Sequence, residues 1–353
     1  MDSHLLKTKS IEQLLSDVET GGKALRRSLT AWDLTLLGVG AIIGTGIFVL
    51  TGTAAANQAG PAIMLSYLAA GLACAFAALC YAEFASMVPI AGSAYTYAYA
   101  SLGEVVAWLI GWDLILEYAV GSMTVAIGWS GYMQRLLIGA GMPLPVWMSA
   151  APSATTPGTI INLPAVFIVL LIGVLLVIGV RESARFNAAM VAVKGTAIVF
   201  FIAVGASWVK PENWSPFAPY GTSGVMAAAA VVFFAYIGFD AVSTTAEEAK
   251  NPRRDLPIGI IASLVVCTLL YLAVAAILSG IVPVTQYRSS AEALPGLPTA
   301  EAGLVTQFLN APVAFALASI GQDWAAYLVS AGAVAGITSS TDVMPATAPA
   351  DTR

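Results

Sequence analysis

Five glycines crowd into one apolar stretch of the chain, GVGAIIGTGIFVLTG at residues 38–52. Glycine costs roughly 1 kcal/mol relative to alanine inside a helix, but it allows the backbone to interrupt the helix or to approach a neighbour closely. In a bilayer, freed N–H and C=O groups are tolerated only where they face protein, water or a ligand. A helix broken there offers N–H donors to an anion and carbonyls to a cation, which suits the two charged ends of an amino acid. The alternative is that these glycines only permit tight helix packing.

A second apolar helix is interrupted in the stretch FFAYIGFDAVSTTAEEAKNP at residues 233–252. Gly238 and Asp240 interrupt it, and Pro252 ends it. The two interrupted spans are five spans apart in the predicted order, so they must run in opposite directions. This is the pattern of an inverted repeat whose broken helices meet near the middle of the membrane.

Lys194 lies about two turns into the apolar stretch AAMVAVKGTAIVFFIAV at residues 188–204. An unpaired cation there is expensive, so ionisable residues within membrane spans are functional by default. Loss of hydration favours the neutral form of a lysine, which would allow Lys194 to titrate. The alternative is a lysine whose amine reaches back to the membrane surface, although two turns of about 11 Å are at the limit of that reach.

Three acidic residues also fall within apolar spans. Asp113 and Glu117 are four residues apart and share one helix face. Glu117 could attract a cationic substrate side chain, and Asp240 could serve a gate or a proton path. For all three, the alternative is an internal network of ion pairs or hydrogen bonds that only holds helices together.

The composition indicates which kind of element positions these groups. Of the residues, 58% are hydrophobic and only 10% are charged. Soluble domains average about 25% charged residues, so the sequence predicts an all-α, polytopic transmembrane helical bundle. Seven spans are expected, at residues 33–53, 61–88, 104–134, 161–180, 187–209, 223–247 and 257–282. Residues 283–322 form the longest external segment, in which we expect short helices.

An eighth helix is expected to begin and then stop. The apolar run at residues 324–337 would reach only about 21 Å, short of a hydrocarbon core of roughly 30 Å. We therefore predict a cytoplasmic N-terminal segment over residues 1–30, a transmembrane transporter domain over 31–338 and a disordered polar tail over 339–353.

Charge placement predicts the orientation of the bundle. With the N-terminus inside, the cytoplasmic segments hold ten lysine and arginine residues and the opposite side holds three, which favours a cytoplasmic N-terminus in a multi-pass protein of the cell membrane. The three cysteines lie in apolar segments and do not suggest a disulfide framework. The sequence contains no phosphate-binding GxxxxGK[ST] loop, so direct drive by ATP is not expected. We expect no enzyme activity, no metal or other cofactor and no nucleic-acid partner.

Four stretches together resemble the amino acid–polyamine–organocation (APC) superfamily, in particular its cationic amino acid transporter group. They are GVGAIIGTGIFVLTG at 38–52, YAEFASMVPIAGSAYTYAYASLGE at 81–104, GWDLILEY at 111–118 and FFAYIGFDAVSTTAEEAKNPRRDLP at 233–257. The resemblance covers roughly residues 25–338 and implies a leucine-transporter-type inverted repeat with broken helices one and six. The family has twelve or more spans, so the second repeat of this chain is expected to be incomplete.

The resemblance also implies roles for individual residues. The N–H groups near Thr45 and Gly46 would bind a substrate carboxylate, the carbonyls of the sixth span would receive its ammonium, and Phe234 would form an aromatic gate. Lys194 would take the place of a sodium ion in proton-coupled members and, with Asp240, would serve proton coupling. The implied substrate-binding residues are Ile42, Ile43, Gly44, Thr45, Gly46, Glu117, Phe234, Ala235 and Ile237.

These observations predict a secondary active amino acid transporter that is coupled to protons and works by alternating access. Its expected partners are an amino acid, protons and the lipid bilayer, and both cationic and small neutral amino acids fit. The alternative is a truncated, non-transporting membrane fragment of such a permease; with an incomplete eighth span, we expect the chain to insert but not to accumulate substrate. A seven-helix receptor is disfavoured by the cytoplasmic N-terminus and the paired broken helices.

Overall fold

The structure is a computed structural model that describes Thr8 and residues 27–88, 93–152, 158–178, 184–288 and 299–346. These residues form a bundle of helices, and their extended pairings are two isolated bridges, Leu29 with Ala249 and Ser149 with Asn162. The outer parts of the predicted N-terminal segment and tail, residues 1–7, 9–26 and 347–353, lie outside the described residues.

Each of the seven predicted spans falls on an apolar helical stretch of the structure. Five of these stretches are long and apolar enough to cross a membrane: Gly46–Met87, Glu104–Gly139, Ala189–Trp208, Gly221–Thr244 and Pro252–Ile281. Two shorter apolar helical stretches, Ala31–Ile42 and Leu163–Leu175, account for the first half of span one and for span four. The prediction of an all-α membrane bundle is therefore confirmed.

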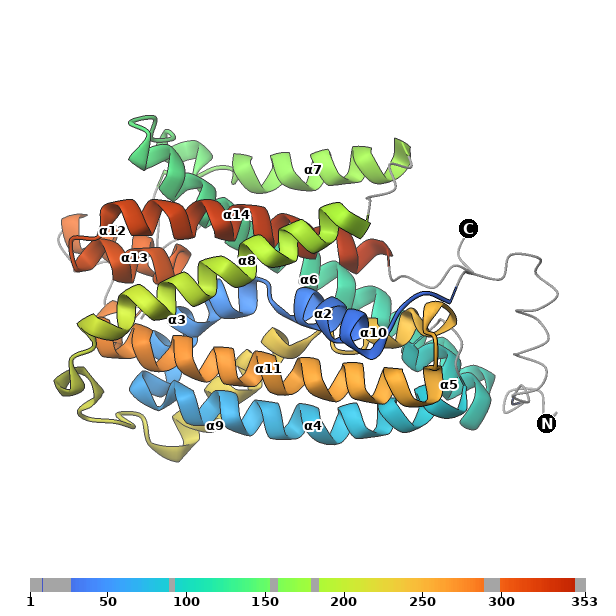
Figure 1. The fold of residues 1–353 in the computed structure, drawn as a ribbon. Helices are drawn as coiled ribbons and strands as arrows, with labels where there is room; N and C mark the ends of the chain where they lie inside the picture. Colours follow the sequence, from blue (N-terminus) through green and yellow to red (C-terminus); the bar gives the residue numbers. More distant parts are fainter. Residues whose placement is uncertain are drawn as a thin grey trace.

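The first and sixth spans are both divided into shorter pieces, as predicted. Span one consists of α2 (Ala31–Ile42), η2 (Gly46–Leu50), α3 (Thr51–Ala54) and η3 (Ala55–Ala59). Span six consists of α9 (Gly221–Phe233), η8 (Phe234–Tyr236), α10 (Ala241–Thr244) and η9 (Ala246–Glu248). In Figure 1, α2 and α3 follow one another in one direction while α9 and α10 follow in the opposite one.

The remaining helices are mostly single rods. The long ones are α4 (Ile63–Met87), α6 (Glu104–Gly139), α7 (Leu163–Ile178), α8 (Ala184–Gly205), α11 (Pro252–Ile281) and α14 (Asp323–Ala346). The short ones are η4 (Gly60–Ala62), α5 (Ser93–Ser101), η5 (Val146–Met148), η6 (Ala206–Trp208), η7 (Pro211–Trp214), η10 (Val284–Tyr287), α12 (Thr299–Asn310) and α13 (Pro312–Ser319). The short helices expected between residues 283 and 322 are thus present as η10, α12 and α13.

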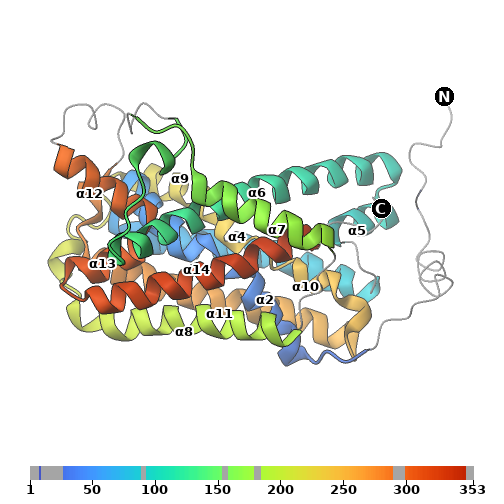
Figure 2. The same ribbon diagram turned by 90° about the horizontal axis from the view of Figure 1, so that it is seen from above.

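The long helices lie roughly side by side and enclose the two broken spans. Helix α11 packs against α4 and α2, while α14 packs against α6 and α8. Figure 1 shows α2 between α11 and α14, and both Figures 1 and 2 show α12 and α13 toward one end of the bundle and α5 toward the other. The largest fully buried side chains include Tyr67, Tyr132, Tyr236, Tyr271 and Lys194, so the bundle interior carries polar groups.

Local capping explains where α2 begins. Thr30 and Asp33 form a reciprocal capping box, in which the Thr30 N–H donates to Asp33 Oδ2 at 2.9 Å and the Asp33 N–H donates to Thr30 Oγ1 at 3.4 Å. This arrangement satisfies two backbone donors that the first turn leaves without an intrahelical partner. The start of the first span is therefore fixed by two residues that precede its apolar run.

The prediction that an eighth helix stops near residue 337 is wrong. Helix α14 runs for 24 residues from Asp323 to Ala346, a length of about 36 Å at 1.5 Å per residue. The first polar residue after the apolar run stays within the helix because the Thr338 hydroxyl donates to Val334 O at 2.8 Å and accepts from Trp129 Nε1 at 3.0 Å. Residues 339–346 continue this helix, in contrast to the predicted disordered tail.

Candidate functional site

The first break lies between Ile42, the last residue of α2, and Gly46, the first residue of η2. Ile43 has extended dihedral angles (φ −73°, ψ 100°), and its N–H still donates to Val39 O. The five residues predicted here to bind substrate, Ile42 to Gly46, are all buried. Because the helix resumes at Gly46, the first N–H groups of the new segment lack intrahelical acceptors, as a carboxylate site requires.

The second break has a glycine that no other residue could replace without strain. Gly238 has φ +112°, and a Cβ there would lie 2.9 Å from the backbone carbonyl of Ala41. A positive φ is disfavoured for residues with a side chain, and the close approach leaves no room for one. Gly238 therefore allows the second break to pass directly over the end of α2.

The two breaks touch one another inside the bundle. Gly46 faces Ala235 so closely that a Cβ on Gly46 would overlap the Cα and Cβ atoms of Ala235. Ala235 is buried, whereas Phe234 and Ile237 on either side of it are partly exposed. The structure therefore brings the two breaks together, and eight of the nine predicted substrate residues, all except Glu117, lie at these breaks.

A tyrosine that the sequence analysis did not single out connects the two breaks. The Tyr271 hydroxyl on α11 lies 2.9 Å from Ile42 O and 2.6 Å from Ala235 O. A hydroxyl has one proton, so it can donate to either carbonyl in turn. Ile42 is the last residue of α2, and Ala235 lies in η8 at the second break. The buried Tyr271 hydroxyl therefore contacts the backbone of both breaks at once.

Two further tyrosines, Tyr67 and Tyr236, form hydrogen bonds that support the helix that resumes at Gly46. The Tyr67 hydroxyl lies 3.1 Å from Gly46 O and 2.7 Å from the Thr51 hydroxyl, and the Tyr236 hydroxyl donates to Tyr67 O at 2.9 Å. The Tyr67 and Tyr271 rings are 5.0 Å apart between centroids. These contacts give the backbone at the first break a rigid polar support on its α4 and α11 side.

Lys194 is buried in the bundle, with 1% of its surface exposed. Its Nζ donates a hydrogen bond to Gly40 O in the last turn of α2, three residues before Ile43. The alternative of an amine that reaches the membrane surface is therefore not what the structure shows. The lysine instead contacts the backbone that leads into the first break.

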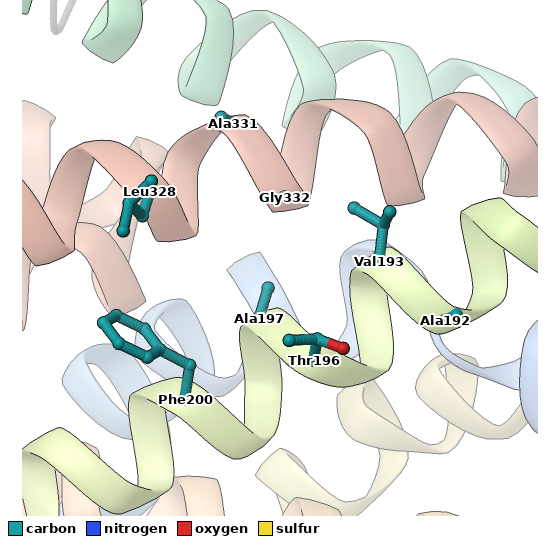
Figure 3. A pocket seen from close by; sticks show the side chains of 8 residues that line it. All are labelled: Ala192, Val193, Thr196, Ala197, Phe200, Leu328, Ala331 and Gly332. Atoms are coloured by element: carbon teal, nitrogen blue, oxygen red, sulfur yellow. The ribbon is translucent and has the colours of Figure 1, made fainter.

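Helix α14 covers Lys194, so the eighth span, although expected to be incomplete, packs against this lysine. A Cβ on Gly336 would overlap the Lys194 Cβ, and a Cβ on Gly332 would lie 2.6 Å from the Ala197 Cβ. Beside these contacts, α8 and α14 border an apolar cavity of about 510 Å³. Figure 3 shows Phe200 and Ala197 of α8 facing Leu328 of α14 across it.

We expect Gly336→Leu to separate α14 from α8 and to lower the midpoint of thermal unfolding in detergent. The added side chain must displace Lys194 or the helix backbone, and overpacking of this kind costs about 1–3 kcal/mol. Ala331→Leu is the matched control, because Ala331 lies on the same helix but is exposed at the cavity. Equal unfolding midpoints for the two variants would show that Gly336 is not a packing constraint.

Asp240 lies in a different environment from Lys194. Its Oδ2 accepts hydrogen bonds from the Ser93 hydroxyl at 3.2 Å and from the Tyr118 hydroxyl at 3.4 Å. Ser93 opens α5, a helix that the sequence analysis did not predict, and Tyr118 belongs to α6. The contacts of the two predicted coupling residues thus involve different elements, α2 and α14 for Lys194 and α5 and α6 for Asp240.

Glu117 lies near Asp240 rather than beside the first break. It is half-buried on α6, close enough to Asp240 for the two carboxylates to interact electrostatically. Gly128 on the same helix contacts Thr45 of the first break, and eleven residues separate Glu117 from Gly128, about 16 Å along the helix. Glu117 therefore lies on the part of α6 whose Tyr118 contacts Asp240, at some distance from the contact between Gly46 and Ala235.

Comparison with known proteins identifies the family to which these broken helices belong. Residues 33–342 match the amino acid permease family. The chain is 52% identical over 345 residues to the branched-chain amino acid permease BcaP of Bacillus subtilis (strain 168), covering 98% of this chain and 70% of that protein. It is 49% identical over 336 residues to the methylthioribose transporter of the same organism, covering 95% of this chain and 68% of that protein.

A more distant relative is the vacuolar cationic amino acid transporter 4 of Arabidopsis thaliana, which is 36% identical over 342 residues. That match covers 95% of this chain and 53% of the plant protein, so the chain spans about half the length of this relative. The family match extends from the first turn of α2 into α14 and includes both breaks. The chain therefore belongs to the amino acid permease family of the APC superfamily.

Proposed function

We propose that this chain binds an amino acid between its two helix breaks and transports it by secondary active, proton-coupled alternating access. The observation that carries the proposal is the direct contact between Gly46 and Ala235, where two interrupted antiparallel spans meet in the bundle interior. Interrupted helices at this depth are tolerated only where they are buried in protein or line a ligand cavity. Paired breaks of opposite direction supply both N–H and C=O groups to one ligand.

The proposed binding mode uses both breaks. The N–H groups at Thr45 and Gly46 receive the substrate carboxylate, and the carbonyls of Phe234, Ala235 and Ile237 receive its ammonium. Ala235 O already lies 2.6 Å from the Tyr271 hydroxyl. A carbonyl oxygen has two lone pairs, so it can accept from Tyr271 and from an ammonium at the same time.

In the proposed coupling, Lys194 holds the proton that accompanies the substrate. Its bond to Gly40 O is stronger when the amine is charged, because hydrogen bonds from ionised donors are roughly twice as strong as neutral ones. Protonation of Lys194 therefore changes how firmly the end of α2 is held. Asp240 has a secondary role in the proposed coupling, because its carboxylate accepts hydrogen bonds from α5 and α6 and so links the second break to these helices.

We propose that the protein lies in the cell membrane with its N-terminus in the cytoplasm. Several of the positively charged residues that predict this orientation lie at one end of the bundle, because Leu29 pairs with Ala249 and brings Arg27 to the side of Lys250. Positively charged residues beside membrane spans favour the cytoplasmic side. Access of a membrane-impermeant reagent to a cysteine placed at residue 27 would test this orientation.

Competition for binding tests the substrate proposal. We expect leucine and lysine to compete for the site of the purified chain, and their decarboxylated amines, 3-methylbutylamine and cadaverine, to bind at least about tenfold more weakly, since loss of one charge-assisted hydrogen bond costs about 1.5–3 kcal/mol. Methylthioribose is the second candidate ligand, because a relative that is 49% identical carries that name. Equal affinity of an amino acid and its amine would contradict carboxylate recognition at Thr45 and Gly46.

The incomplete eighth span is the reason to expect insertion without accumulation, but helix α14 runs for 24 residues, so we propose transport by this chain and keep the non-transporting fragment as the alternative. Binding and transport therefore need separate measurements. Binding is measured on the purified chain, and accumulation in proteoliposomes under an imposed proton gradient. Accumulation of labelled leucine would exclude the fragment. Binding without accumulation would support the site and contradict the proposal of transport by this chain.

A further inference from the structure

Four of the fifteen lysine and arginine residues of the chain line a single pocket of about 570 Å³. The pocket is bordered by Arg27, Lys250, Asn251, Pro252, Arg253 and Arg254. These residues come from two segments, one before span one and one between spans six and seven, and none of the six is acidic. A pocket with this lining attracts an anion, and the guanidinium groups of arginine match phosphate oxygens in geometry.

The backbone holds the two segments of this basic pocket together. The N–H groups of Ser28 and Leu29 donate to Glu248 O at 2.9 and 3.0 Å, and the Lys250 N–H donates to Leu29 O at 2.8 Å. Arg27 and Lys250 directly flank these three bonds. The fold therefore holds the positive charges of Arg27 and Lys250 close together, with Asp33 near enough to Lys250 to interact with it electrostatically.

Two carboxylates at the same helix ends are already engaged. Asp255 is buried, and its Oδ2 accepts from the Asn251 N–H at 3.2 Å, while Asp33 caps the first turn of α2 through the Thr30 N–H. The N-terminus of the 30-residue helix α11 lies in the same region, and its dipole also favours a negative charge.

The basic pocket lies where the bundle enters the membrane. The candidate span Pro252–Ile281 begins at the pocket, and Ile258, in its second turn, has 42% of its surface exposed. Trp32 in the first turn of α2 is 69% exposed, and tryptophan is enriched at the level of lipid headgroups. An anion confined to that level, at high local concentration, is the headgroup of an acidic phospholipid.

We propose that the basic pocket binds the phosphate headgroup of an anionic phospholipid. The bound headgroup bridges the segment before the first break and the segment after the second one. Its occupancy therefore stabilises one relative position of α2 and α11. The proposal does not depend on the transported substrate, because lipid binding is measurable without one.

The test is titration of the purified 353-residue chain with dioleoylphosphatidylglycerol or dioleoylphosphatidylcholine, followed by native mass spectrometry. We expect phosphatidylglycerol to bind at least tenfold more tightly than phosphatidylcholine. The triple variant K250Q, R253Q and R254Q should lose this preference, while its backbone tie is kept because Lys250 uses only its N–H there. The matched control R135Q, K210Q and R288Q removes the same charge elsewhere and should keep the preference.

A second variant separates charge from folding. The double variant R253K and R254K keeps the positive charges and should retain the phosphatidylglycerol preference. Equal loss of preference in the pocket and control variants, or no preference in the original chain, would overturn the proposal. Binding of inorganic phosphate at millimolar concentration with no added preference for phosphatidylglycerol would also overturn it, since the pocket would then serve a soluble anion.

Discussion

Replacement of Lys194 by alanine is expected to make amino acid uptake insensitive to an imposed proton gradient. Lys194 is buried and donates to Gly40 O, directly before the first break. Loss of a hydrogen bond from a charged donor costs about 1.5–3 kcal/mol, which corresponds to roughly a tenfold to hundredfold effect. Uptake by the unmodified chain should rise as the external pH falls, because the protonated lysine holds α2, and this rise should be absent in the variant.

Two other variants and a second assay make this prediction specific. Lys210→Ala removes an exposed lysine and should leave the response to pH unchanged. Lys194→Arg keeps a permanent charge and should also be insensitive to pH, provided the larger group is accommodated. Exchange of labelled for unlabelled substrate without a gradient reports whether the site still works. A normal proton response in Lys194→Ala would place coupling elsewhere, with Asp240 as the next candidate.

The sequence was sufficient to predict features that depend on local backbone chemistry. Gly238 is needed because its φ is +112°, and a conformation that only glycine adopts readily is visible in the sequence as a glycine inside an apolar helix. Lys194 was recognisable for a similar reason, because a charge in an apolar span has a large desolvation cost wherever its neighbours lie. Each of these inferences needed only the residue and its immediate surroundings.

Features that depend on distant contacts were not predictable in this way. Tyr271 is 229 residues from Ile42 in sequence, and a tyrosine in an apolar span has no property that identifies its partner. The extension of α14 was missed because Thr338 begins a polar stretch. In the structure its hydroxyl donates a hydrogen bond to Val334 O and accepts one from Trp129 Nε1. The separation of Glu117 from the first break likewise appears only when the register of α6 against Thr45 is known.

Gly46→Ala is expected to weaken amino acid binding by at least about tenfold, a loss of about 1.4 kcal/mol. The new methyl group would overlap the Cα and Cβ atoms of Ala235, so the two breaks would have to move apart. Backbone atoms cannot turn aside as the end of a flexible side chain can, and overpacking costs about 1–3 kcal/mol. Both the N–H groups near Gly46 and the carbonyl of Ala235 would then leave their positions. Equilibrium binding to the purified variant measures the effect.

Gly52→Ala is the matched control, and it decides between a substrate site and simple helix packing. A Cβ on Gly52 would overlap Pro312 of α13, a comparable clash that lies six residues, about 9 Å along the helix, beyond Gly46. If the glycines of span one serve only packing, the two variants should unfold at similar temperatures and lose binding to a similar degree. If the breaks hold the substrate, Gly46→Ala should lose binding while Gly52→Ala keeps it at a temperature where both remain folded. Retention of full binding by Gly46→Ala would contradict a substrate site between Gly46 and Ala235.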